Sequence, residues 1–159
     1  MNKTNAMRIL DQKKISYEVR EYEVDESDLS GKHVLEVTGL DGKMVYKTLV
    51  AKGERSGYVV FCIPVLAELD LKKCARAIND KRVELIPMKD LEGLTGYIRG
   101  GCSPVGMKKQ FRTWFQQECE QLDTISVSGG RRGLQILVDP KQLIKLINGR
   151  TADLIQEDN

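Results

Sequence analysis

Histidine is almost absent from this sequence of 159 residues, in which His33 is the only one. A metal site with two histidine ligands is therefore excluded. A serine or cysteine nucleophile activated by a histidine would have to use His33. Its neighbourhood, Gly31 to Val37, is typical of the first turn of a helix, so we expect this imidazole to be solvated or to lie on a helix surface.

Cysteine is also sparse, with four residues at positions 62, 74, 102 and 119. They form no Cys-x-x-Cys pair, which excludes a zinc knuckle and a thioredoxin-like redox pair. Four thiols in a chain of this length are not a disulfide framework, and they suit a reducing compartment. The Walker and dinucleotide-binding glycine patterns are missing as well, so we expect no metal and no cofactor.

Long hydrophobic runs are missing too. A run such as Tyr58 to Ile63 is far shorter than the roughly 20 residues that a membrane helix needs. The first residues lead into a short amphipathic stretch and not into an apolar signal core. We therefore expect a soluble cytoplasmic protein with no membrane partner.

Neither sign of charge dominates, because 25 basic and 23 acidic residues leave a net charge of +2. Bulk coating of nucleic acid is therefore not expected. The near balance hides an acidic segment, 18–28, and two basic zones, 72–82 and 99–112. Each basic zone is either an ordinary solvated surface or a local phosphate contact, as for one end of an RNA.

The chain length predicts a single domain, residues 1–159. Alternating apolar runs around glycine turns predict two hairpins, and capped apolar stripes predict the helices. The expected hairpins pair 44–52 with 58–64 and 124–128 with 133–138. The first expected helix ends near residue 14, and the other helices are expected over 30–37, 71–79, 88–94 and 139–149. The remaining strands are expected over 17–23, 83–86 and 110–115. This mixture predicts an α/β (α+β) fold with a mixed sheet, and a frayed acidic end.

The segment Gly100-Gly101-Cys102-Ser103-Pro104-Val105-Gly106 is expected to form a fixed, tight loop. Such a loop turns backbone N–H groups outward and can cradle an oxyanion, although a tight turn alone explains the same residues. Cys102 and Ser103 resemble nucleophiles, but neither has a base nearby in the sequence. Covalent catalysis by the protein is therefore not expected.

Two further features allow a structural and a functional interpretation. The turn 128–133 is explained by a hairpin, yet Arg131 and Arg132 at its tip are free to meet a phosphate. Lys47 lies in the middle of an apolar strand, where alternation places it on one face with Val45 and Leu49. Such a lysine either reaches solvent along its stem or serves a ligand.

Three segments together, 46–50, 95–109 and 127–134, resemble the YbaK/EbsC-type Cys-tRNA(Pro) deacylases over nearly the whole chain. The relatives of that family include the editing domain of bacterial prolyl-tRNA synthetases and free-standing Ala-tRNA(Pro) deacylases. The resemblance implies a single aminoacyl-tRNA editing domain with a mixed, partly barrel-like sheet surrounded by helices. It also implies hydrolysis of mischarged tRNA(Pro) in trans, beside prolyl-tRNA synthetase.

The resemblance also implies a set of site residues. The family's essential lysine corresponds to Lys47. The other implied positions are the pocket threonine Thr48, the Gly-x-x-x-Pro loop Gly100, Gly101, Cys102, Ser103 and Pro104, the pocket aromatic Tyr22 and the pocket carboxylate Asp139. Alanine-editing relatives carry a histidine at that loop, where this chain has Gly101 and Cys102. The difference favours cysteine as the cargo.

The family mechanism needs no protein nucleophile, because the substrate's own thiol attacks its ester carbonyl. On this hypothesis Lys47 anchors the terminal nucleotide, and the N–H groups of Gly100, Gly101 and Cys102 hold the oxyanion. The candidate RNA contacts are Lys108, Lys109, Arg131 and Arg132. The alternatives are an Ala-tRNA(Pro) deacylase, a non-catalytic aminoacyl-tRNA-binding module and a general RNA-binding domain.

Overall fold

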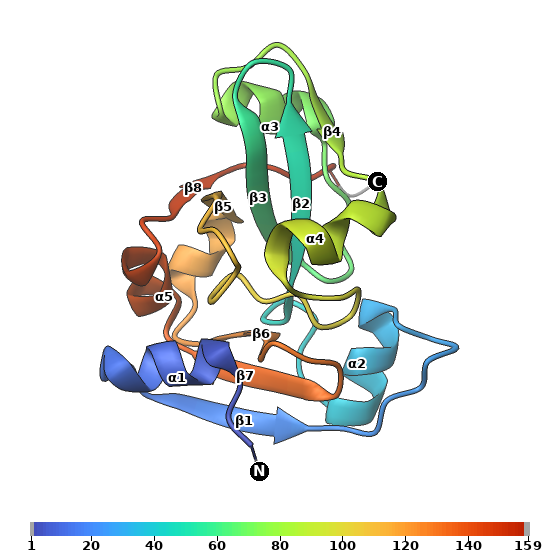
Figure 1. The fold of residues 1–159 in the computed structure, drawn as a ribbon, viewed down its shortest axis with the longest axis vertical. Coiled ribbons are helices and arrows are strands. Elements are labelled where there is room, and N and C mark those ends of the chain that lie inside the picture. The colour runs from blue at the N-terminus through green and yellow to red at the C-terminus, as the bar shows by residue number, and fades with distance from the viewer. Residues whose placement is uncertain (1, 158–159) are drawn as a thin grey trace.

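The computed structural model describes residues 2–157, whose strands form two sheets. The smaller sheet is antiparallel, in the order β1-β7-β6, and the larger is mixed, in the order β4-β2-β3-β5-β8. The strands are β1 (Tyr17–Glu21), β2 (Tyr46–Gly53), β3 (Gly57–Pro64), β4 (Val83–Leu85), β5 (Arg112–Gln116), β6 (Ile125–Ser128), β7 (Leu134–Val138) and β8 (Arg150–Ala152). In Figure 1 the β2–β3 hairpin stands upright above the smaller sheet.

The helices surround these sheets, as Figure 1 shows. They are α1 (Asn5–Gln12), α2 (Gly31–Thr38), α3 (Leu71–Ala77), α4 (Leu91–Thr95) and α5 (Pro140–Leu146), with 3-10 turns η1 (Met88–Asp90) and η2 (Gln117–Gln121). Ser30 and Asp70 accept hydrogen bonds from the first free N–H groups of α2 and α3, which confirms the predicted starts of both helices. No helix among the described residues is long and apolar enough to cross a membrane.

Both predicted hairpins are confirmed. β2 and β3 pair from Tyr46↔Pro64 to Gly53↔Gly57, and β6 pairs with β7 from Ile125↔Val138 to Ser128↔Gln135. Alternation along β3 sends its apolar side chains into two cores. Val60 and Cys62 face the larger core, which also contains β6 and β7, while Phe61 and Ile63 face the core under α3.

The two sheets meet at Val45, which forms a parallel bridge with Ser126. The carbonyl of Val45 also accepts a hydrogen bond of 2.9 Å from the N–H of Val65. The mixed α/β fold is therefore confirmed, but the sheets remain open and do not close into a barrel. The junction places the start of β2 beside the smaller sheet, which is where the candidate site lies.

The expected fraying of the acidic end does not extend over residues 150–156, which are paired and packed. β8 pairs in parallel with β5, and Leu69 bridges Ile155 in the antiparallel sense. The cause is an apolar anchor, because the side chain of Leu154 is fully buried in the core under α3. Residues 158 and 159 lie outside the described part of the chain.

Asp80, which follows α3, fastens the turn between β2 and β3. Its carboxylate accepts hydrogen bonds from the hydroxyl and the N–H of Ser56 and from the N–H groups of Arg55 and Lys81. These bonds, with that of the Ser56 hydroxyl as the largest cause, hold the pKa of Asp80 well below its ordinary value. A Cβ at Gly53 would collide with the same carboxylate, so the turn leaves no room for a side chain there.

This arrangement predicts a pH-dependent contribution to stability. A lowered folded-state pKa stabilises the fold above the unfolded-state pKa of about 4, and the effect is lost as the pH falls below it. Asp80→Asn should therefore unfold at lower urea than the parent at pH 7. The difference should shrink at about pH 3. The exposed Asp123→Asn is the matched control, and a parent–variant difference independent of pH would contradict the assignment.

Candidate functional site

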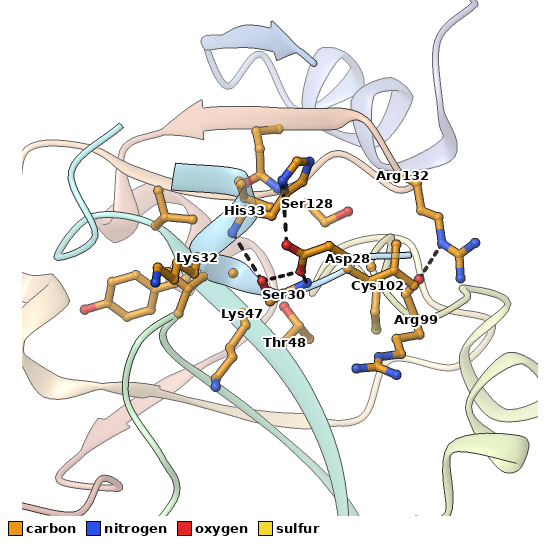
Figure 2. A pocket seen from close by; sticks show the side chains of 18 of the residues that line it. Asp28, Ser30, Lys32, His33, Lys47, Thr48, Arg99, Cys102, Ser128 and Arg132 are labelled. Atoms are coloured by element: carbon orange, nitrogen blue, oxygen red, sulfur yellow. Dashed lines mark hydrogen bonds and ion pairs between the residues drawn. The ribbon is translucent and has the colours of Figure 1, made fainter. Parts of the chain in front are cut away.

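A pocket of about 530 Å³ lies where the start of β2 meets the smaller sheet. Its walls come from the segment 22–34, from 45–49 at the start of β2, from 65–68, from 88–91 and from 99–102. Ser128, Arg132 and Gln135 of the β6–β7 hairpin complete it. Segments far apart in the sequence therefore converge on one cavity, shown from close by in Figure 2.

Adjacent residues of β2, Lys47 and Thr48, both line this pocket. The Thr48 hydroxyl lies 3.7 Å from the thiol of Cys62. Figure 2 shows Lys47 and Arg99 extending to the same side, away from His33. No ion pair within residues 2–157 involves Lys47, so its ammonium remains available to a ligand.

The glycine loop forms another part of the wall. Gly100 adopts a φ of +85°, a left-handed conformation that favours glycine. A Cβ on Gly101 would come within 2.9 Å of the Arg131 backbone, because the loop packs tightly against the β6–β7 turn. Gly100 and Cys102 line the pocket, so the loop that the sequence predicted lies at the same cavity as Lys47.

The backbone N–H groups of this loop are not equivalent. The N–H of Gly101 donates a hydrogen bond of 2.9 Å to the carbonyl of Ile98. Within residues 2–157, the N–H groups of Gly100 and Cys102 have no such partner. The N–H of Gly101 is therefore used to close the turn, which leaves those of Gly100 and Cys102 as the loop donors without a backbone acceptor.

Ser103 and Cys102 are both poor candidates for a nucleophile. Ser103 is fully buried, and its hydroxyl accepts a hydrogen bond from the N–H of Val105. Burial raises the pKa of the Cys102 thiol to about 12, so it is protonated at neutral pH. Ser103 and Pro104 do not line the pocket. They contribute to the rigidity of the loop, whereas Gly100 and Cys102 are the loop residues that line the pocket.

The chain is similar in sequence to known proteins. A family model for the aminoacyl-tRNA editing domain matches residues 30–146. The chain is 47% identical over 156 residues to an Enterococcus faecalis protein provisionally named Cys-tRNA(Pro)/Cys-tRNA(Cys) deacylase EbsC, covering 98% of this chain and 95% of that protein. The chain belongs to the aminoacyl-tRNA editing domain family.

Solved structures show the same fold at lower identity. One, provisionally described as a trans-editing enzyme for prolyl tRNA synthetase, has a TM-score of 0.81 and 22% identity and covers 99% of this chain and 100% of that chain. Another, of the hypothetical protein APE2540, has a TM-score of 0.86 and 16% identity and covers 96% and 100%. At these identities the likeness is one of fold alone.

Asp139 does not belong to the pocket of this editing domain. Its carboxylate accepts a hydrogen bond of 2.9 Å from the N–H of Lys141 and thereby caps α5. The assignment of a pocket carboxylate to Asp139 is therefore corrected, because helix capping uses the group elsewhere. Tyr22, in contrast, lines the pocket. Its backbone N–H donates a hydrogen bond of 2.9 Å to the carbonyl of Gly133.

The four candidate RNA contacts lie in different places. Arg132 lines the pocket, and its Nε donates a hydrogen bond of 2.8 Å to the carbonyl of Arg99. Arg131 donates to the carbonyl of Asn2, while Lys108 donates to that of Gly93. Lys109 lies over the ring of Phe111. These three are outside the pocket lining, so only Arg132 can touch what the pocket holds.

His33 lies in the first turn of the surface helix α2, as predicted, but it also forms part of the pocket wall and is less solvated than expected. Its side chain is 17% exposed, and its Nδ1 lies 3.9 Å from the carboxylate of Asp28. Its Nε2 is buried and has no hydrogen-bond partner among the described residues. Sequence reasoning missed Asp28, Ser30 and His33 as site residues. The acidic segment that precedes α2 was their only signal.

Proposed function

We propose that this editing domain is an aminoacyl-tRNA deacylase that clears cysteine from Cys-tRNA(Pro). One observation carries the proposal: the pocket offers a cation and two free backbone donors, while neither Cys102 nor Ser103 of the glycine loop is paired with a base. Lys47 is the cation, and the N–H groups of Gly100 and Cys102 are the donors. Such a site can position an ester and stabilise negative charge, while the attacking atom comes from the substrate.

The proposed reaction uses the thiol of the esterified cysteine. Its sulfur loses a proton and attacks the ester carbonyl, forming a carbon–sulfur bond. The carbon–oxygen bond to the terminal ribose then breaks, and the ribose oxygen takes up a proton as the tRNA leaves. The product is a small cyclic thioester that water opens to free cysteine. A thiol pKa of about 8.5 allows some thiolate at neutral pH, and nearby positive charge increases that fraction.

This chemistry also explains selection among amino acids. A pocket that rejects one methylene by size alone gains only about 10- to 200-fold. Alanine and proline carry no thiol, so they are rejected by the chemical step and not by binding. Bulky side chains need only be excluded from the cavity. The proposal therefore favours cysteine over alanine as the cargo.

Selection of the tRNA must come from outside this pocket. Cys-tRNA(Cys) carries the same ester, and the name of the Enterococcus relative includes both substrates. We expect discrimination to require a complex with prolyl-tRNA synthetase, which charges tRNA(Pro) in the cytoplasm. The acceptor end of mischarged tRNA(Pro) is then the RNA partner.

Side-by-side deacylation of Cys-, Ala- and Pro-charged tRNA(Pro) tests the proposal. Release of cysteine alone is the expected result. Release of alanine at an equal or higher rate would identify an Ala-tRNA(Pro) deacylase instead. Binding of all three without hydrolysis would identify a non-catalytic module. Salt-sensitive binding to unrelated RNAs, independent of the amino acid, would identify a general RNA-binding domain.

Removal of the hydroxyl or the thiol of the loop should leave catalysis largely intact. We expect Ser103→Ala and Cys102→Ala each to keep substantial turnover of Cys-tRNA(Pro), because neither group takes part in bond formation. Rapid-quench measurement of cysteine release would check this. Complete loss of turnover in either variant, with an unchanged melting temperature, would instead identify a protein nucleophile.

A further inference from the structure

The charges that line the pocket are of both signs. The basic side chains are Lys32, Lys47, Arg99 and Arg132, and the acidic ones are Asp25, Asp28 and Glu68. In Figure 2 the carboxylate of Asp28 lies beside Ser30 and His33, whereas Lys47 and Arg99 extend to another side. The pocket therefore offers a place for a cation as well as for an anion.

Asp28 is held in place with part of its hydrogen-bonding capacity unused. Its Oδ1 accepts hydrogen bonds from the N–H of Ser30 at 3.1 Å and from the hydroxyl of Ser30 at 2.6 Å. Its Oδ2 lies 3.9 Å from His33 Nδ1, beyond hydrogen-bond distance. The side chain is 47% exposed, and a carboxylate can accept about four hydrogen bonds. Oδ2 can therefore accept a donor from a ligand.

The carboxylate of Asp28 is charged at neutral pH. The hydrogen bond from the Ser30 hydroxyl, followed by that from the Ser30 N–H, lowers the pKa of Asp28 below its ordinary value. Asp25 resembles it in part, since its Oδ1 accepts from the N–H and hydroxyl of Ser27. Asp28 differs from Asp25 because it is hydrogen-bonded to Ser30 and lies beside His33, and both of these residues belong to the pocket wall. These neighbours fix the position of its free oxygen.

An aminoacyl ester on tRNA carries charges of both signs, as the pocket does. The phosphates of the RNA end are anionic, and the α-amino group beside the ester carbonyl is a cation when protonated. We propose that Asp28 binds the α-ammonium group of the esterified amino acid and thereby selects free aminoacyl esters over esters whose amino group is blocked or absent. This inference rests on the proposed function and adds to it the group that distinguishes aminoacyl-tRNA from peptidyl-tRNA.

Two esters on the same tRNA(Pro) test the proposal. One carries cysteine, and the other carries 2-hydroxy-3-sulfanylpropanoate, in which a hydroxyl of similar size replaces the amino group and the thiol is kept. Asp28→Asn removes the charge but keeps an oxygen that can accept from Ser30. Asp41→Asn is the matched control, because the Asp41 carboxylate caps a similar turn through the N–H of Lys43 and lies outside the pocket.

Asp28→Asn should lower kcat/KM for the cysteine ester about 10- to 100-fold, the effect typical of a lost hydrogen bond to a charged group. It should change kcat/KM for the hydroxy ester less than about twofold, because that ester lacks the cation. The ratio of kcat/KM for the two esters is compared between the parent and each variant, because the intrinsic reactivity of each ester then cancels. Asp41→Asn should leave both values at those of the parent.

Three results would overturn the proposal. An equal loss on both esters would show that Asp28 only shapes the wall. If the ratio of kcat/KM for the cysteine ester to that for the hydroxy ester stayed at the parental value in Asp28→Asn but fell in Asp25→Asn, the carboxylate of Asp25 would be the one that binds the ammonium group. A parent protein that cleaves neither ester would overturn the proposed function, and this inference with it. Cleavage of the cysteine ester by the parent keeps the function and leaves the ratio to decide on Asp28.

Discussion

Replacement of Lys47 by alanine is expected to lower the rate of Cys-tRNA(Pro) deacylation by about 10²- to 10³-fold, the cost typical of one lost electrostatic contact to the developing oxyanion. Lys47 is the β2 cation in the pocket, and no described residue forms an ion pair with it. In the proposed mechanism, its loss removes both an anchor for the RNA end and the positive charge beside the ester. Single-turnover kinetics with saturating protein would separate the chemical step from binding.

Two further variants make this result interpretable. Lys47→Met keeps the aliphatic stem and removes only the charge, so it should be as inactive as Lys47→Ala while retaining the melting temperature of the parent. Lys52→Met changes a lysine of the same strand that is exposed, lies over the Tyr58 ring and is outside the pocket. It should keep parental activity. A fully active Lys47→Met would show that the ammonium has no role.

Leu154→Ala is expected to destabilise the protein by about 2–5 kcal/mol, the range for a leucine truncated in a core. Leu154 is fully buried. Its N–H donates a hydrogen bond of 2.7 Å to the Gln116 side chain, and its carbonyl accepts one of 2.8 Å from the N–H of Asp70. The C-terminal segment therefore links β5 to the start of α3 through these two hydrogen bonds. Urea unfolding at neutral pH would measure the loss.

Leu85→Ala is the matched control for that experiment. The side chain of Leu85 is 50% exposed, so its truncation should change the free energy of unfolding by no more than about 0.5 kcal/mol. Should Leu154→Ala prove as mild as Leu85→Ala, the segment after β8 contributes little to the fold.

Local signals in the sequence were sufficient for most secondary structure. The cap at Ser30, the cap at Asp70 and both hairpins follow from short-range hydrogen bonding and alternation, and all are confirmed. Boundaries moved by a few residues. The first helix ends at Gln12 because Lys14 adopts a φ of +58°. The helix expected over 88–94 is a 3-10 turn followed by α4.

The candidate site was predictable only in part. Lys47 was recognisable as a single charge among apolar neighbours, and the loop was recognisable as a dense group of glycines. Asp28 and His33 had no such mark, because an acidic surface segment and a histidine in a first helical turn are common in proteins. Asp139 was assigned to the pocket but caps α5, since an aspartate before a proline serves a helix start equally well.

Sequence alone determined most of the elements, the family resemblance and the absence of a two-histidine metal site, because these depend on residue types and short spacings. Tertiary structure decided which wall each group occupies, since the pocket joins segments from Tyr22 to Gln135 that only long-range packing brings together. It also decided which loop N–H groups remain free, because the turn that shapes the loop uses that of Gly101.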